Sequence, residues 1–164
     1  MRVAVLTISD AGAKGERVDT SGDSIVAWAQ GHGFELVLRS IVPDDAVEIV
    51  RALLDWADNE KADLILTTGG TGLSPRDRTP EATRAVIEVD ASGLIERIRV
   101  ATLGQFPRGA LSRAVAGVRH KSLIVNLPGS PGGVRDALAA LDPVIQHAVD
   151  IVREAPTDHS PGKR

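Results

Sequence analysis

The chain of 164 residues contains no cysteine, so it can form neither a disulfide nor a thiolate metal site. Aromatic side chains make up only 2% of it, which leaves few platforms for stacked bases. The formal net charge is −3, whereas nucleic-acid-binding domains are typically basic. No apolar run approaches the roughly 18 residues of a membrane helix. We therefore expect neither nucleic acid nor a membrane as a partner.

The length favours a single domain. A domain of about this size buries roughly two-thirds of its unfolded surface and needs no disulfide or metal to stabilise it. The first residues, 1–8, are too few for a signal peptide, which favours a cytoplasmic location. We assign residues 1–154 to the domain and expect the polar, proline-containing residues 155–164 to form a flexible C-terminal tail.

Short apolar runs alternate with segments of helical periodicity along the chain. This alternation predicts an α/β fold, a three-layer α/β/α domain around a mostly parallel, mixed sheet. We predict strands at residues 2–8, 34–42, 63–67 and 122–125. We predict helices at about residues 21–31, 47–57 and 92–103. A further helix starts at Pro80, with Thr79 as its cap. Residues 134–153 should form two helices that meet at Asp142-Pro143.

Polar segments follow four of these strands directly. In an open parallel sheet, ligands bind beyond the carboxyl ends of the strands. If the four strands run parallel, the segments after them meet at one rim, whereas an antiparallel strand would carry its segment away. The segments are Ser9-Asp10, Pro43-Asp44-Asp45, Thr68 to Asp77, and Asn126 to Gly133.

The glycine-rich stretch Thr68 to Gly72 (TGGTG) is the most informative of them. Three glycines in four residues let backbone N–H groups approach a ligand closely, and successive N–H groups can form an anion-binding nest. The hydroxyls of Thr68, Thr71 and Ser74 add donors. The stretch matches neither the Walker A motif nor G-x-G-x-x-G, so it is either an anion-binding loop or a tight turn.

The next residues place the carboxylate of Asp77 between Arg76 and Arg78. Asp77 could hold Mg²⁺ together with phosphate oxygens, or it could pair with a neighbouring arginine on a solvated loop. Asp44 and Asp45 can both cap the helix that follows, although one of them could face the rim instead. The polar residues after Asp10 form either a mobile flap or a plain surface loop.

Other candidates carry weaker signals. Arg113 could reach a phosphate or lie along the surface. The proline- and glycine-rich stretch from Asn126 can line a pocket with backbone groups. The four histidines share no metal-ligand spacing, so we expect them at the surface or at helix ends.

Taken together and in this order, the segments resemble the molybdopterin adenylyltransferases of the MoaB/Mog group over about residues 1–153. Arg78 departs from the resemblance, because the family more often has a small apolar residue there. Gly132-Gly133 also replaces a bulkier pair. The matching stretches are LTISD (6–10), SG (21–22), VPDD (42–45), TGGTGLSPRD (68–77), TPEAT (79–83), LSRAVAG (111–117) and NLPGSP (126–131).

The resemblance implies a fold of the molybdopterin-binding-domain type and a homotrimer or dimer of trimers. It implies that AMP is transferred from Mg-ATP to the terminal phosphate of molybdopterin, with release of pyrophosphate. Asp44 and Asp77 become the catalytic acids and the Mg²⁺ ligands, and a molybdenum-insertion enzyme becomes a possible partner downstream. The implied substrate contacts are Ser9, Asp10, Thr68, Gly69, Gly70, Thr71, Gly72, Ser74, Arg76, Ser112, Arg113, Asn126, Pro128, Gly129 and Ser130.

The nearest alternative is a protein of the same fold that binds molybdopterin as a carrier or accessory protein without adenylylating it. Molybdenum-inserting transferases carry large additional domains that this chain has no room for. Competence-damage-type domains typically have Gly-Gly-Leu-Gly-Pro-Thr where this chain has Gly-Gly-Thr-Gly-Leu-Ser. We therefore expect an enzyme of molybdenum cofactor biosynthesis.

Overall fold

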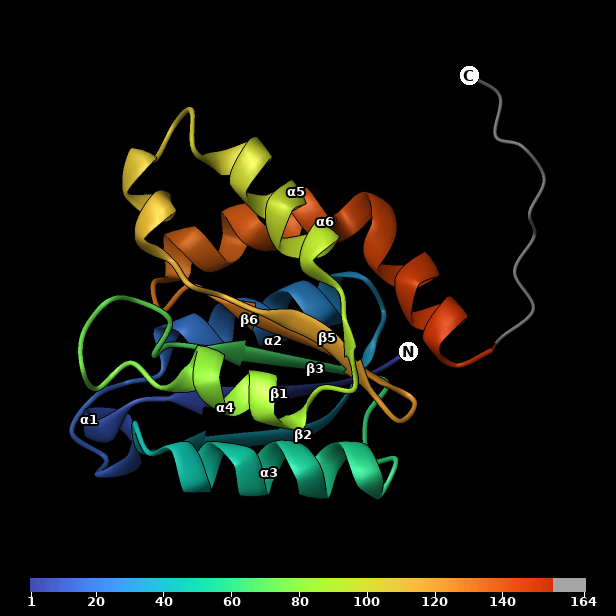
Figure 1. Ribbon diagram of the computed structural model, residues 1–164, viewed down its shortest axis with the longest axis horizontal. Coiled ribbons are helices and arrows are strands. Elements are labelled where there is room, and N and C mark those ends of the chain that lie inside the picture. The colour runs from blue at the N-terminus through green and yellow to red at the C-terminus, as the bar shows by residue number, and fades with distance from the viewer. Residues whose placement is uncertain (155–164) are drawn as a thin grey trace.

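A computed structural model describes residues 1–154, so the tail expected at residues 155–164 lies outside the described residues. The strands form one six-stranded sheet with helices on both of its faces (Figure 1). The strands are β1 (Arg2–Ile8), β2 (Glu35–Val42), β3 (Leu64–Thr68), β4 (Val89–Asp90), β5 (Ala116–Arg119) and β6 (Ser122–Leu127). The helices are α1 (Asp10–Ala13), α2 (Thr20–Gly31), α3 (Ala46–Asp58), α4 (Thr79–Val86), α5 (Ser92–Thr102) and α6 (Pro131–Val152), with a 3₁₀ helix, η1, at Pro107–Leu111.

The strand order is β2-β1-β3-β6-β5-β4. The first four strands of this order are parallel, whereas β5 runs antiparallel to β6 and β4 antiparallel to β5. The predicted mixed, mostly parallel sheet is therefore confirmed. The sequence analysis missed β4 and β5, because strands of two and four residues are too short to show a pattern of alternation.

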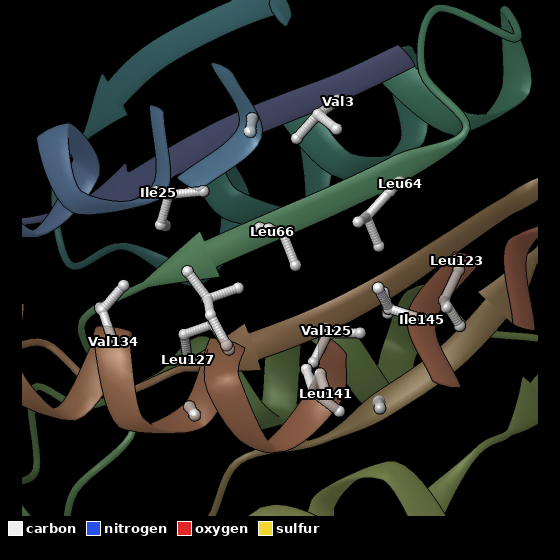
Figure 2. Close-up of a cluster of buried hydrophobic side chains, with 14 of the residues drawn as sticks. Val3, Ile25, Leu64, Leu66, Leu123, Val125, Leu127, Val134, Leu141 and Ile145 are labelled. Carbon is white, nitrogen blue, oxygen red and sulfur yellow. The ribbon is translucent and has the colours of Figure 1, made fainter. Parts of the chain in front are cut away.

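The core consists of two apolar layers, one on each face of the sheet, because successive strand residues point to opposite faces. Alternate residues of β1 show this: Val3 and Val5 face α2, α5 and α6, whereas Ala4 and Leu6 face α3 and α4. In Figure 2, Leu66 of β3 lies near Ile25 of α2, and Val125 of β6 lies beside Leu141 of α6. The strands buried on both faces thus form a rigid support for the segments at their ends.

The expected break at Asp142-Pro143 is wrong, because α6 continues through Pro143. Proline removes one backbone donor, but Leu138, Leu141 and Ile145 on either side are buried against the sheet and hold the helix in place. The carbonyl of Ala140 in this turn accepts a hydrogen bond of 2.6 Å from Arg97 Nε. Packing thus outweighs the local tendency of proline to end a helix.

Two local expectations near the rim also need correction. Residues 10–13, expected to be part of a polar loop, form the short helix α1, which Ser9 caps by accepting the N–H of Gly12. Thr79 is the first residue of α4 and not its cap, and Arg78 occupies the cap position without a side-chain hydrogen bond. No helix within residues 1–154 is long and apolar enough to cross a membrane.

Candidate active site

The four polar segments meet at one rim of the sheet, as the sequence predicted. The parallel strands β2, β1, β3 and β6 all end there: Val42 pairs with Ile8, Thr7 pairs with Thr68, and Thr68 pairs with Leu127. Asp45 caps α3 by accepting the N–H groups of Val47 and Glu48. Its neighbour Asp44 is left to face the rim, where it lines a hollow beside the glycine-rich loop.

The loop from Gly69 to Gly72 begins with two residues whose backbone conformation favours glycine. Gly69 and Gly70 have φ values of +97° and +62°. A Cβ on Gly69 would lie 2.3 Å from the carbonyl oxygen of Ile8, and one on Gly70 would lie 2.4 Å from Thr79 Oγ1. Gly129 of the neighbouring loop packs so closely that its Cβ would lie 3.2 Å from Gly69 Cα. The glycines are therefore required for packing as well as for access to the backbone.

Two threonines fix this loop in place. Thr79 is fully buried, donates its hydroxyl to Gly69 O at 2.9 Å and donates its N–H to Gly70 O at 3.1 Å. Thr68 donates its hydroxyl to Pro128 O at 2.6 Å and thereby joins the loops that follow β3 and β6. The Thr79 side chain and backbone thus tie the start of α4 to the glycine-rich loop.

Asp10 and Asp44 are joined by reciprocal hydrogen bonds. The N–H of Asp10 donates to Asp44 Oδ2 at 2.9 Å, and the N–H of Asp44 donates to Asp10 Oδ1 at 3.0 Å. Arg76 reaches across from the loop after β3 and pairs with Asp10 Oδ2 at 2.5 Å. The rim segments after β1, β2 and β3 thus form one network.

The pKa values of the two acids move in opposite directions. Burial raises the pKa of Asp44, and the negative charges of Asp10 and Asp77 raise it further, although the Asp10 N–H acts against them. The Arg76 hydrogen bond lowers the pKa of Asp10. Asp44 is therefore a half-buried carboxyl group with a raised pKa, beside an Asp10 whose pKa is lowered.

Asp77 does not pair with the arginine that precedes it, because Arg76 pairs with Asp10. Asp77 Oδ2 instead accepts the N–H of Ser74 at 2.8 Å, and the N–H of Asp77 donates to Ser74 O at 2.9 Å. The carboxylate is turned toward the glycine-rich loop, since a Cβ on Gly72 would lie 2.8 Å from Asp77 Oδ2.

Arg113 and Asn126 hold the framework of the site. The Arg113 guanidinium donates to Gly72 O at 2.7 Å and to Asp77 O at 2.8 Å, and it also pairs with Glu81. Asn126 is fully buried; its Oδ1 accepts the N–H of Val115, and its Nδ2 donates to two threonine hydroxyls, those of residues 67 and 83. Both amide hydrogens of Asn126 are thus engaged, whereas Arg113 uses three of its five N–H donors.

The four serines of the rim share one arrangement. Each hydroxyl oxygen accepts a backbone N–H two or three residues further along the chain, which leaves the hydroxyl hydrogen to donate elsewhere. Such a hydrogen could be donated to an oxygen of a bound anion. The pairs are Ser9 with Gly12, Ser74 with Arg76, Ser112 with Ala114, and Ser130 with Gly133.

Two hollows flank the glycine-rich loop. The larger, which we call the apolar cleft, has a volume of about 380 Å³ and is lined by the loop, Asp77 and the side chains of α5 and η1. The smaller, the polar hollow, has a volume of about 240 Å³ and contains Asp44 and Ser9. Gly70 and Gly129 line both. Two ligands could therefore meet at the loop from opposite sides.

The sequence analysis did not name several residues that line these hollows. The apolar positions of α5 follow helical spacing and were therefore interpreted only as part of a helix face. Asp19 caps α2 and comes after an irregular segment. Its position directly before a helix is the signal by which the sequence could have identified it as a cap. The unnamed residues include Ile95, Ile98, Arg99, Phe106 and Arg108 in the apolar cleft, and Arg17, Asp19 and Thr20 in the polar hollow.

Comparison with known proteins identifies the group to which this site belongs. Residues 4–147 match the family model described as a probable molybdopterin binding domain. The molybdopterin biosynthesis enzyme MoaB of Thermus thermophilus is 50% identical, with a TM-score of 0.89, covering 94% of this chain and 98% of that one. The molybdopterin adenylyltransferase of Helicobacter pylori J99 is 39% identical over 93% of this chain and 88% of that protein.

A longer relative contains the same segment. The molybdenum cofactor synthesis protein cinnamon of Drosophila melanogaster is 40% identical over 90% of this chain but only 25% of that protein. The match with the family model covers most of the described chain, and the Thermus and Helicobacter proteins align over nearly their whole length. The chain therefore belongs to the family of probable molybdopterin-binding domains.

Proposed function

We propose that the protein catalyses the adenylylation of molybdopterin in molybdenum cofactor biosynthesis. It transfers AMP from Mg-ATP to the terminal phosphate of molybdopterin and releases pyrophosphate. The observation that carries the proposal is the pair of hollows that share Gly70 and Gly129, with Asp77 in one and Asp44 in the other. The Helicobacter relative, named a molybdopterin adenylyltransferase, supports the same activity.

The reaction needs positioning more than it needs a base. An oxygen of the molybdopterin phosphate attacks the α-phosphorus of ATP, and the bond from that phosphorus to the oxygen bridging to the β-phosphate breaks. Because the nucleophile is already an anion, no proton has to be removed from it. Two anions must instead be brought together and their charge neutralised, as in phosphoryl transfer generally.

The rim residues suit this task. The backbone N–H groups of the loop at Gly70 to Gly72 and the hydroxyls of Ser9, Ser74, Ser112 and Ser130 are donors for phosphate and pterin oxygens. Arg113 and Asn126, which the sequence suggested as substrate contacts, act in this proposal by holding the loops in place.

The magnesium of Mg-ATP would be held by Asp44 and Asp77 together with phosphate oxygens. Carboxylate oxygens are the ligands that Mg²⁺ prefers, and one or two of them are typical when phosphates complete the coordination. The raised pKa of Asp44, caused by burial and by two neighbouring carboxylates, fits a position that a cation would stabilise. In this proposal the ion enters the site together with the phosphates of ATP. Its role there is to neutralise charge on the triphosphate.

We further propose a cytoplasmic homotrimer or dimer of trimers. Large apolar side chains of α5 and η1 are exposed, among them Val100, Phe106 and Leu111, and such surfaces are common at subunit interfaces. A monomer at micromolar concentration in light scattering would contradict this assembly. We propose a molybdenum-insertion enzyme as the downstream partner. In the longer cinnamon protein, the segment that matches this chain makes up only a quarter of the protein, so it is joined there to further sequence.

One assay separates this proposal from a carrier that only binds molybdopterin. Purified protein is mixed with molybdopterin, ATP and Mg²⁺, and pyrophosphate and adenylyl-molybdopterin are measured. We expect both products, and neither when any one component is left out. Molybdopterin binding without pyrophosphate release would refute the enzymatic function and favour the carrier.

A further inference from the structure

The ion pair between Arg76 and Asp10 joins two segments that lie 66 residues apart in the sequence. It links α1 to the loop that carries Asp77, beside Asp44. We propose that Asp10 is a positioning residue that holds Arg76 beside Asp44 in the free protein and gives it up to the polyphosphate of ATP. This inference rests on the proposed function.

Asp10 has little capacity left to bind a substrate itself. Its Oδ1 accepts the N–H of Asp44, and its Oδ2 accepts Arg76. As a carboxylate it would also repel phosphates. Its direct role is therefore toward its protein neighbours, which revises the expectation that it contacts the substrate.

The Arg76 side chain can exchange Asp10 for another anionic partner. Its side chain is 65% exposed, and Asp10 is the one acid with which it pairs within residues 1–154. A guanidinium has five N–H donors, so one contact leaves most of its capacity for another ligand. Phosphate groups match the guanidinium geometry and carry more charge than a carboxylate. A triphosphate at the glycine-rich loop is therefore a stronger partner than Asp10.

Because the ion pair is exposed, separating Arg76 from Asp10 also requires little free energy. Ion pairs between exposed side chains typically change an equilibrium by about 2- to 5-fold. If ATP must first separate Arg76 from Asp10, the apparent affinity for ATP is reduced by about that factor, as for any ligand that binds a less populated arrangement. Removing the charge of Asp10 should then tighten ATP binding, whereas damage to an active site ordinarily weakens it.

The test is calorimetric titration of the full chain with Mg-ATP in the absence of molybdopterin. Asp10→Asn keeps an oxygen that can accept the N–H of Asp44 but loses the charge that holds Arg76. Asp58→Asn is the matched control, because Asp58 forms an ion pair with Arg119, at 2.6 Å, at the end of α3 that is remote from Asp44. We expect Asp10→Asn to bind Mg-ATP about 2- to 5-fold more tightly than the wild type and the control to bind it equally well.

Two further measurements identify the group that Arg76 binds. Inorganic pyrophosphate with Mg²⁺ should show the same gain in Asp10→Asn, and adenosine, which lacks phosphate, should show none. Adding Arg76→Gln to Asp10→Asn should remove the gain. Equal or weaker Mg-ATP binding by Asp10→Asn, or a gain that survives Arg76→Gln, would overturn the role of Asp10. Failure of the wild type to bind Mg-ATP at all would instead count against the proposed function.

Discussion

Replacing Gly70 by alanine tests how the glycine-rich loop is built. Gly70 has a φ of +62°, a conformation that costs other residues about 1–2 kcal/mol. The new Cβ would lie 2.4 Å from Thr79 Oγ1, which is buried and hydrogen-bonded to Gly69 O. Moving that hydroxyl would break the hydrogen bond and leave the Gly69 carbonyl without this donor, at a cost of about 1–2 kcal/mol. We therefore expect a loss of about 2–4 kcal/mol in the free energy of unfolding.

Urea unfolding and thermal melting measure this loss. At this chain length, 1 kcal/mol corresponds to about 2–4 °C in the midpoint, so the midpoint should fall by roughly 5–15 °C. Gly33→Ala is the matched control, because Gly33 has a φ of +69° but would have no atom within 4 Å of a Cβ. Adenylylation by Gly70→Ala should fall about 100-fold, because the loop that holds the phosphates shifts. Gly33→Ala should stay active.

A double-mutant cycle with Thr79→Ala isolates the clash. Without the Thr79 hydroxyl, Gly70→Ala should cost only the backbone strain, about as much as Gly33→Ala. The coupling between the two substitutions should be about 1–2 kcal/mol. If Gly70→Ala costs no more than Gly33→Ala in the wild-type background, the contact between Gly70 and Thr79 does not constrain the loop, and our account of it is wrong.

Three other substitutions test the remaining parts of the site. Asp77→Asn should lower pyrophosphate release at least about 100-fold with little change in the melting midpoint, because it removes charge from a rim loop; a collapsed midpoint would make Asp77 structural. Arg113→Lys should lower kcat/KM about 10-fold, because a single ammonium group does not replace the guanidinium fork that holds Gly72 O, and full activity would contradict this. Burial raises the pKa of Asp19, but the Arg39 hydrogen bond and further donors outweigh it, so its pKa lies below the ordinary 3.8. The stability that Asp19 contributes is therefore present above pH 3.8 and is lost as the pH falls through the lower pKa of the folded state. Asp19→Asn should be less stable than the wild type at pH 7, and the difference in the free energy of unfolding should shrink in acid. A difference that does not depend on pH would contradict this.

The positions of the main strands along the chain, and of the polar segments after them, could be predicted because both depend on local pattern. The strand at residues 63–67 is nearly all apolar, as burial on both faces requires, and the polar segments begin where such strands end. Asp44 lies two residues after its strand, and Asp77 lies in the polar segment that begins at the end of the next strand along the chain. Parallel pairing of these strands then brings both acids to one edge of the sheet.

The partners of the charged side chains could not be predicted from the sequence. Arg76 stands next to Asp77 in the chain but pairs with Asp10, and Arg113 holds a loop 41 residues before it. Which ion pairs and hydrogen bonds form depends on which segments the folded sheet brings together. The residues next to a charged side chain in the sequence do not reveal this. Pro143 shows the same limit, because only packing against the sheet keeps α6 continuous there.

The sequence by itself determined that Thr68 to Gly72 is a loop in which backbone N–H groups are accessible, because three glycines so close together exclude side-chain cover. Only the tertiary structure decided what surrounds this loop. There Thr79, Gly129 and Arg113 fix the loop between two hollows, one with Asp44 and one with Asp77. A hollow is formed by surfaces from distant segments, so it exists only once those segments are packed.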